Sequence, residues 1–211
     1  MTAPSLRFLP CGREAVLVEV DGLPAALALY AALRTAALPG VVDLVPAART
    51  VLVRFDPDLT SPGAVRAAVA GLPAERYDAV DGGVVELPVR YDGPDLAEVA
   101  TLTGLSVGEV VAAHTGTPWT VAFAGFAPGF AYLTGGDPRL AVPRRDSPRT
   151  RIPAGSVGLA GRFSGVYPAD SPGGWQLVGR TEVRVWDLGR PRPALLVPGM
   201  RVRFRAVDPC G

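Results

Sequence analysis

A serine that could act as a nucleophile lies in the stretch IPAGSVGLAG, at position 156. Hydrolases that expose a nucleophilic serine on a tight turn carry the pattern G-x-S-x-G, and this stretch departs from it only by Ala154. An α/β-hydrolase places its histidine after the serine, whereas His114, the only histidine of this chain, precedes Ser156 by 42 positions. Other folds use other chain orders, so Ser156 is either a nucleophile or a small residue on a tightly packed strand, and we favour the second interpretation.

Arginines are concentrated in the same region. Residues 137–180 hold seven arginines and three aspartates, a local net charge of +4. In the segment PRRDSPRTRIPAG, at residues 143–155, three prolines stiffen the chain around Arg149 and Arg151. Arg180 follows in the stretch SPGGWQLVGRT. A planar guanidinium group suits bidentate binding of a carboxylate, so we expect an anion to bind here.

Two alternatives apply to this arginine-rich segment. It could form a phosphate or nucleic-acid patch, but a nucleic-acid-binding domain usually has a larger positive excess than the pI of about 7.8 indicates. The arginines could also be solvated and form salt bridges with Asp146 and Asp137. We therefore expect no nucleic-acid partner.

Aromatic residues lie among glycines and prolines in the stretches GFAPGFAYL and SPGGWQLVGRT. Glycine allows the backbone to approach a ligand closely, and Phe126, Phe130 and Trp175 could form the wall of a cleft. Each of them taken singly is better explained as a core residue. Together with the arginine segment, the two stretches favour a shared pocket or a partner surface.

Composition excludes several kinds of chemistry. All 21 basic residues are arginine, so the chain has no lysine for a P-loop or a Schiff base. A single histidine excludes a multi-histidine metal site, and we expect no metal. His114 follows a capping box, SVGE, at the end of a predicted helix, where it has either a structural role or a role in proton transfer. Cys11 and Cys210 are expected to be free thiols.

The hydrophobic pattern predicts two domains. Strands at residues 5–10 and 15–20, a helix at 24–36, a strand pair and a helix opened by Ser61 form an α+β unit with a split βαβ arrangement. The turn residues at 81–83 mark its end. The domains are therefore residues 1–83 and 84–211.

The second domain begins with a strand, VVELPVRY, and two short helices. After Trp119, short β-like runs separated by glycine and proline predict a barrel or sandwich, and these runs include EVRVWDL and ALLV at residues 182–188 and 194–197. The sequence shows neither a signal peptide nor an apolar run long enough to span a membrane, so we expect a cytoplasmic protein with no membrane partner.

The segment from Gly125 to Thr181, GFAPGFAYLTGGDPRLAVPRRDSPRTRIPAGSVGLAGRFSGVYPADSPGGWQLVGRT, resembles the KipI family, whose members are also known as allophanate hydrolase subunit 1 or as the B-type subunit of 5-oxoprolinase. The similarity extends more weakly over residues 91–116 and 193–207. The N-terminal part fits in layout, although Arg13 and Glu14 stand where the family has a Gly-Asp pair.

This resemblance implies a small ferredoxin-like α+β domain followed by a cyclophilin-like β-barrel. It also implies a KipA-like partner, or C-type subunit, and an A-type subunit, which together with this chain hydrolyse 5-oxo-L-proline to L-glutamate at the expense of ATP. Two alternatives come with it. One is a regulator that inhibits a sporulation histidine kinase and is antagonised by KipA, and the other is a subunit related to allophanate hydrolase or urea carboxylase.

Residue roles in such an assembly follow from the composition and from the arginine and aromatic residues named above. We expect no cofactor on this chain alone, because it lacks a phosphate-binding motif, and ATP would be used by the complex. His114 is the candidate for proton transfer. The candidates for substrate binding are three arginines and four aromatic residues, namely Arg149, Arg151, Arg180, Phe126, Phe130, Tyr167 and Trp175.

Overall fold

The computed structural model describes residues 6–72 and 83–207 of the 211-residue chain. The chain divides into two compact units, residues 1–78 and 79–211. Two residues of the expected boundary turn, Asp81 and Gly82, lie outside the described residues, so the exact boundary stays a prediction.

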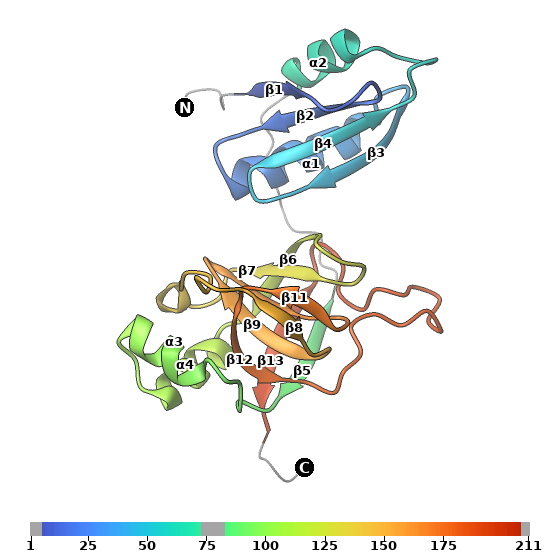
Figure 1. Ribbon diagram of the computed structural model, residues 1–211. Helices are drawn as coiled ribbons and strands as arrows, with labels where there is room; N and C mark the ends of the chain where they lie inside the picture. The colour runs from blue at the N-terminus through green and yellow to red at the C-terminus, as the bar shows by residue number, and fades with distance from the viewer. Residues whose placement is uncertain (1–5, 73–82, 208–211) are drawn as a thin grey trace. The chain divides into compact units, whose positions relative to one another are not determined.

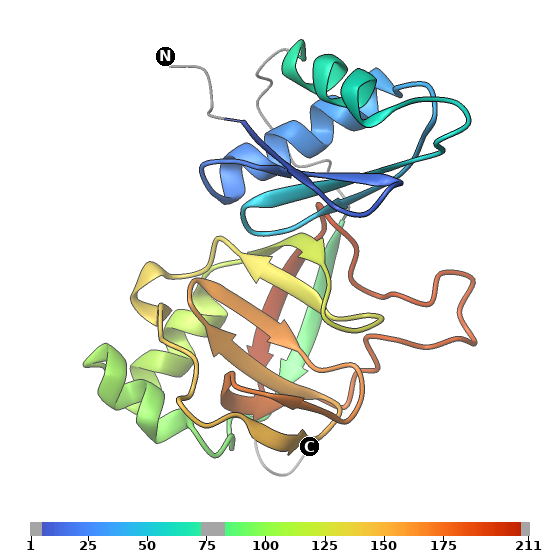
Figure 2. The ribbon, with the colours of Figure 1, turned by 45° about the horizontal axis from the view of Figure 1, so that its top comes forward.

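The N-terminal unit is a four-stranded antiparallel sheet with two helices on one face (Figure 2). Its elements are β1 (Arg7–Pro10), β2 (Ala15–Glu19), α1 (Leu23–Ala36), β3 (Val41–Pro46), β4 (Thr50–Phe55) and α2 (Pro62–Ala70). The sheet order β1-β2-β4-β3 places β4 between β2 and β3, which is the split βαβ arrangement. Alternate strand residues such as Val16, Val18 and Val53 pack against both helices. The finer class, ferredoxin-like, stays a prediction.

The C-terminal unit is a nearly closed, barrel-like sheet flanked by helices (Figure 1). Its first elements are β5 (Val84–Val89), α3 (Leu96–Thr103), α4 (Val107–Gly116), β6 (Trp119–Ala124), β7 (Ala131–Thr134) and a 3₁₀ turn (Pro138–Leu140). The later ones are β8 (Arg149–Ile152), β9 (Ser156–Ala160), β10 (Phe163–Val166), β11 (Ser171–Gly173), β12 (Gln176–Arg180) and β13 (Arg201–Ala206). Seven strands follow the order β12-β9-β10-β7-β6-β13-β5, and β8 pairs with β11 separately. The expected α+β class with a barrel-like second unit is thus present.

The two ends of the seven-stranded sheet meet along one line, which we call the seam and define as residues 90–95 together with β12. Arg90 and Arg180 exchange two backbone hydrogen bonds of 2.9 Å. The Asp95 N–H then donates to the Leu177 carbonyl at 3.0 Å. These bonds join β12 to the segment that follows β5, so the backbone groups at this edge are paired.

Glycines allow the backbones of the seam to approach this closely. A Cβ atom at Gly179 would lie 2.4 Å from the Arg90 carbonyl oxygen, and one at Gly93 would lie 2.3 Å from the Leu177 carbonyl oxygen. Backbone atoms cannot swing aside as the end of a flexible side chain can. The seam therefore requires glycine at both positions.

Two of the expected β-like runs form no strand. In residues 182–188 and 194–197 the only pairing within the described part of the chain is an isolated bridge between Trp186 and Ala194. Pro191, Pro193 and Pro198 flank the second run and lack the N–H that a ladder needs, which limits its pairing with the first run. The small β8–β11 sheet was not predicted.

Replacing Gly179 by alanine should lower the free energy of unfolding by about 3 kcal/mol, because the added methyl group overlaps a backbone carbonyl that is held in the seam. Gly108→Ala is the matched control. A Cβ there meets nothing within 4 Å, and alanine in a helix is favoured by up to about 1 kcal/mol over glycine. Urea unfolding measures both variants, and equal stability of the two would contradict the tight seam.

Candidate functional site

The three arginines singled out in the sequence, Arg149, Arg151 and Arg180, line one hollow beside the seam. Its volume is about 460 Å³, and Ser156 and Thr181 also line it. We call it the Arg151 hollow. Residues from β8, β9 and β12 thus come together here, as expected for an anion site, while the binding role itself stays a prediction.

Two of these arginines form exposed ion pairs. Nη2 of Arg151 lies 2.7 Å from the Asp170 carboxylate, and Nη2 of Arg180 lies 2.8 Å from Asp92. The N–H of Ala154 and the Arg151 guanidinium both hold the pKa of Asp170 below its ordinary value. The arginine side chains are 78% and 55% exposed, so water and salt screen both pairs and each contributes little to stability. A ligand carboxylate could therefore replace either aspartate at low cost.

Arg149 is held differently, in a cluster around the buried carboxylate of Asp95. Arg149 donates to both carboxylate oxygens, at 2.9 and 2.7 Å, and Arg145 donates to one of them at 2.7 Å. The Leu177 N–H donates to Asp95 at 2.7 Å. The Asp95 side chain is only 3% exposed, so Arg149 ties β8 to the seam and is not a free cation.

The ionisation of Asp95 is a balance between burial and its partners. Burial by itself raises the pKa of this carboxyl group, but the hydrogen bonds from Arg149 and Leu177 and the charges of Arg149 and Arg145 outweigh it and lower the pKa. Sequence reasoning missed Asp95. A signal was available, because Asp95 follows a Gly-Pro pair and directly precedes helix α3.

Most of the aromatic candidates form a core cluster. Phe130, Tyr167 and Trp175 are at most 4% exposed, and the ring of Phe130 lies 5.2 Å from each of the other two in edge-to-face contact. Burial raises the pKa of Tyr167 to about 12. Phe126 differs, because it is 57% exposed and its φ of 68° is in the left-handed region. Phe126 is therefore the member of the set that a ligand or partner can reach.

Ser156 is 7% exposed on β9, where its carbonyl oxygen accepts the Tyr167 N–H at 2.9 Å. The imidazole of His114 is hydrogen-bonded to Tyr91 and Ser164, and no hydrogen bond joins it to Ser156 among the residues that the structure describes. This arrangement supports the interpretation of Ser156 as a small residue on a packed strand.

His114 is fully buried near the end of α4. Its Nδ1 lies 2.7 Å from the Tyr91 hydroxyl, its Nε2 lies 2.8 Å from Oγ of Ser164, and its ring stacks on Phe204 at 4.3 Å. Burial lowers its pKa to about 3, so the imidazole is neutral, with one ring nitrogen donating and the other accepting. Burial thus outweighs the preference of a helix end for a cation, and the geometry favours a structural role over proton transfer.

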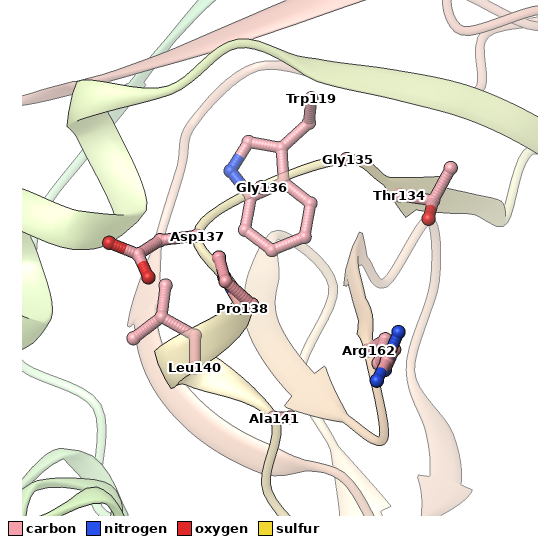
Figure 3. A pocket seen from close by; sticks show the side chains of 9 residues that line it. All are labelled: Trp119, Thr134, Gly135, Gly136, Asp137, Pro138, Leu140, Ala141 and Arg162. Atoms are coloured by element: carbon pink, nitrogen blue, oxygen red, sulfur yellow. The ribbon is translucent and has the colours of Figure 1, made fainter.

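A smaller hollow of about 180 Å³ lies beside Trp119 (Figure 3). The loop at Gly135 and Gly136 passes across the indole ring, and Arg162 stands at the edge of the hollow. The nearby carboxylate of Asp137 is held by Arg139 at 2.6 Å. The expected partner Asp137 thus binds a different arginine from those in the Arg151 hollow.

The described residues, 6–72 and 83–207, hold no group of three or more His, Cys, Asp or Glu side chains arranged to bind a metal ion. No single helix in this part of the chain is long and apolar enough to cross a membrane, and α3 and α4 pass that test only as a pair bent by 89°. Cys11 is exposed and free, and Cys210 lies outside the described residues.

Comparison with known proteins assigns the family. The sequence model of the carboxyltransferase domain, subdomain C and D, matches residues 6–196. The B-type subunit of 5-oxoprolinase from Bacillus subtilis (strain 168) is 39% identical over 208 residues, covering 90% of this chain and 85% of that protein. The chain belongs to the family of B-type 5-oxoprolinase subunits. The resemblance seen in the sequence is confirmed.

Further similarities agree with this assignment. The protein of the same name from Escherichia coli O157:H7 is 39% identical over 92% of both chains. The crystal structure of TTHA0988 is 41% identical and has a TM-score of 0.76, with 92% of this chain aligned. This chain spans 40% of the TTHA0988 chain. The fold described above is therefore shared with a solved structure.

Acid should destabilise the protein through His114. In the folded state its pKa is about 3, against an ordinary 6.5, so only the unfolded chain takes up this proton as the pH falls below 6.5. Stability from this group is complete above pH 6.5 and is lost as the pH falls towards 3. One pH unit of such a shift corresponds to about 1.4 kcal/mol, so the loss between pH 6.5 and 4.5 is about 2 kcal/mol.

The measurement is urea unfolding across this pH range for the wild type and for His114→Gln. Because His114 is the only histidine, the difference between the two pH slopes isolates its titration. We expect the variant to be less stable than the wild type at pH 7, and its free energy of unfolding to change less with pH. Identical slopes would show that the folded imidazole takes up its proton at the ordinary pH.

Proposed function

We propose that this chain is the B-type subunit of an ATP-dependent 5-oxoprolinase, in which A-type and C-type subunits complete the active assembly. The observation that carries this proposal is the 39% identity to two proteins that bear this subunit's name, over 85% and 92% of their lengths. In the proposed reaction, water adds across the lactam C–N bond of 5-oxo-L-proline and L-glutamate is released. ATP is consumed by the assembly.

The contribution of this chain is to bind and orient, and its own residues support that division of labour. The sequence has no lysine and no phosphate-binding loop, so we assign the nucleotide to another member of the assembly. His114 and Ser164, a hydrogen-bonded pair that could otherwise activate a nucleophile, are both completely buried. Water and substrate would therefore meet their proton-transfer group elsewhere in the complex.

Carboxylate binding is the role that we propose for Arg151 and Arg180. Both guanidinium groups are exposed, lie in one hollow and hold carboxylates that a ligand could replace. Arg149 lines the same hollow and is held by Asp95, and Phe126 presents an exposed ring. We further propose that the two units are of the ferredoxin-like and cyclophilin-like classes. The kinase regulator and the allophanate hydrolase or urea carboxylase subunit stay alternatives.

The proposal is tested by co-expressing the chain with A-type and C-type subunits and measuring ATP-dependent glutamate release from 5-oxoproline. We expect release that depends on all three subunits. If the A-type and C-type subunits release as much glutamate without this chain, the proposed function is wrong.

Arg180→Gln and Arg151→Gln should each reduce glutamate release about tenfold or more, since each removes a charged hydrogen bond to a carboxylate. Arg49→Gln is the control, because Arg49 is a similarly exposed arginine, 66%, paired with Glu19 in the N-terminal unit. Ser156→Ala should retain activity. Full activity of both Arg180→Gln and Arg151→Gln would contradict the carboxylate-binding role.

A further inference from the structure

A third hollow, of about 420 Å³, lies where the ends of β5, β12 and β13 meet. We call it the Arg90 hollow. Its lining residues are Pro88, Arg90, Arg180, Thr181, Glu182, Arg205 and Val207. Neither Arg90 nor Arg205 stood out in the sequence, because the two are 115 positions apart and each lies in an ordinary strand pattern.

The backbone fixes where these arginines project. Arg90 and Arg180 form a closely paired antiparallel bridge with reciprocal 2.9 Å hydrogen bonds, so their side chains leave the seam on the same face. Arg205 lies on β13 opposite Pro88 of β5, and it points away from the core because its neighbour Phe204 is buried. Three guanidinium groups from three segments therefore border one hollow.

Among the described residues that line this hollow, three arginines face one glutamate. Arg180 is paired with Asp92, but no ion pair within residues 83–207 involves Arg90 or Arg205. Like charges placed directly across a strand pair are destabilising, and Arg90 and Arg180 occupy such positions. An anion bound beside Arg90, within reach of Arg205, would offset the positive charge that these arginines bring to the hollow. Glu182, on the same wall, supplies one negative group and could receive an ammonium group.

We propose that the Arg90 hollow binds a small amino acid that carries a side-chain carboxylate, with Arg90 and Arg205 on its carboxylates and Glu182 on its ammonium group. Guanidinium forks match carboxylate geometry, and the volume lies within the range of small-ligand sites. The inference rests on the residues of this hollow and does not require the proposed activity. It adds a subsite next to the Arg151 hollow, with which it shares the lining residues Arg180, Thr181 and Glu182.

The test is calorimetric titration of the full chain, alone, with L-glutamate, glutarate and inorganic phosphate at low salt. We expect saturable binding of L-glutamate, weaker binding of glutarate, which lacks the ammonium group, and no comparable binding of phosphate. Arg90→Gln and Arg205→Gln should each weaken L-glutamate binding about tenfold, as expected for the loss of one charged hydrogen bond.

Arg203→Gln is the matched control. Arg203 lies two positions from Arg205 on the same face of β13, opposite Glu86, and does not line the hollow. Its replacement removes the same charge and should change L-glutamate binding less than twofold. Arg90 is partly buried, so Arg90→Gln could lose binding because the fold is destabilised, which a lower melting temperature would reveal. In that case the exposed Arg205 decides the test.

Four results would overturn the proposal. The first is no saturation of the wild type by L-glutamate up to about 10 mM. The second is equal binding of phosphate, which would indicate a general anion site. The third is an equal loss in Arg203→Gln, which would indicate diffuse charge. The fourth result has two parts: no small acid binds the wild type, and the Arg90→Gln/Arg205→Gln double variant fails to assemble with the other subunits. That result would assign the hollow to an acidic surface of a partner. Glutamate release by the assembly is scored separately, so the two proposals can fail independently.

Discussion

Four hydrogen bonds converge on the buried carboxylate of Asp95, and they join the start of α3, the segment before β8, β8 itself and β12. Burying a carboxylate is costly unless it is paired and fully hydrogen-bonded, and here two arginines and a backbone N–H meet that requirement. Because Asp95 is also the last residue of the seam, the same side chain that neutralises Arg149 holds the barrel closed.

The Arg151 hollow and the Arg90 hollow both depend on this closure. The Arg151 hollow is bounded by β8 and β12, which Asp95 connects, and the Arg90 hollow begins at the Arg90–Arg180 bridge at the other end of the seam. Strands and tight glycine contacts thus fix the backbone that carries the arginines of both hollows. A rigid base that carries guanidinium groups suits recognition of a carboxylate that arrives with a substrate or with another member of the assembly.

Local signals in the sequence predicted the elements well. Ser106 and Glu109 form the expected capping box, Ser61 caps α2, and β3 and β4 pair as expected. Charge and proline spacing singled out Arg149 and Arg151, and the fold brings Arg180 to the same hollow, while their binding role stays a prediction. The partner of Arg149 did not, because Asp95 is 54 positions away and only the tertiary fold brings the two together. The burial of His114 was missed for the same reason, since its neighbours Tyr91 and Ser164 come from other elements.

The central claim is that Asp95 holds the seam beneath both hollows. Amide hydrogen exchange of Arg90, Asp95, Leu177 and Arg180 in Asp95→Asn tests it directly, with Asp92→Asn as the control that removes an exposed carboxylate from the same segment. Loss of the Asp95 charge should cost about 3 kcal/mol, as breaking a buried ion pair does, and should speed exchange at these amides by about a hundredfold, while the control changes little. Unchanged protection of the seam in Asp95→Asn would contradict this account.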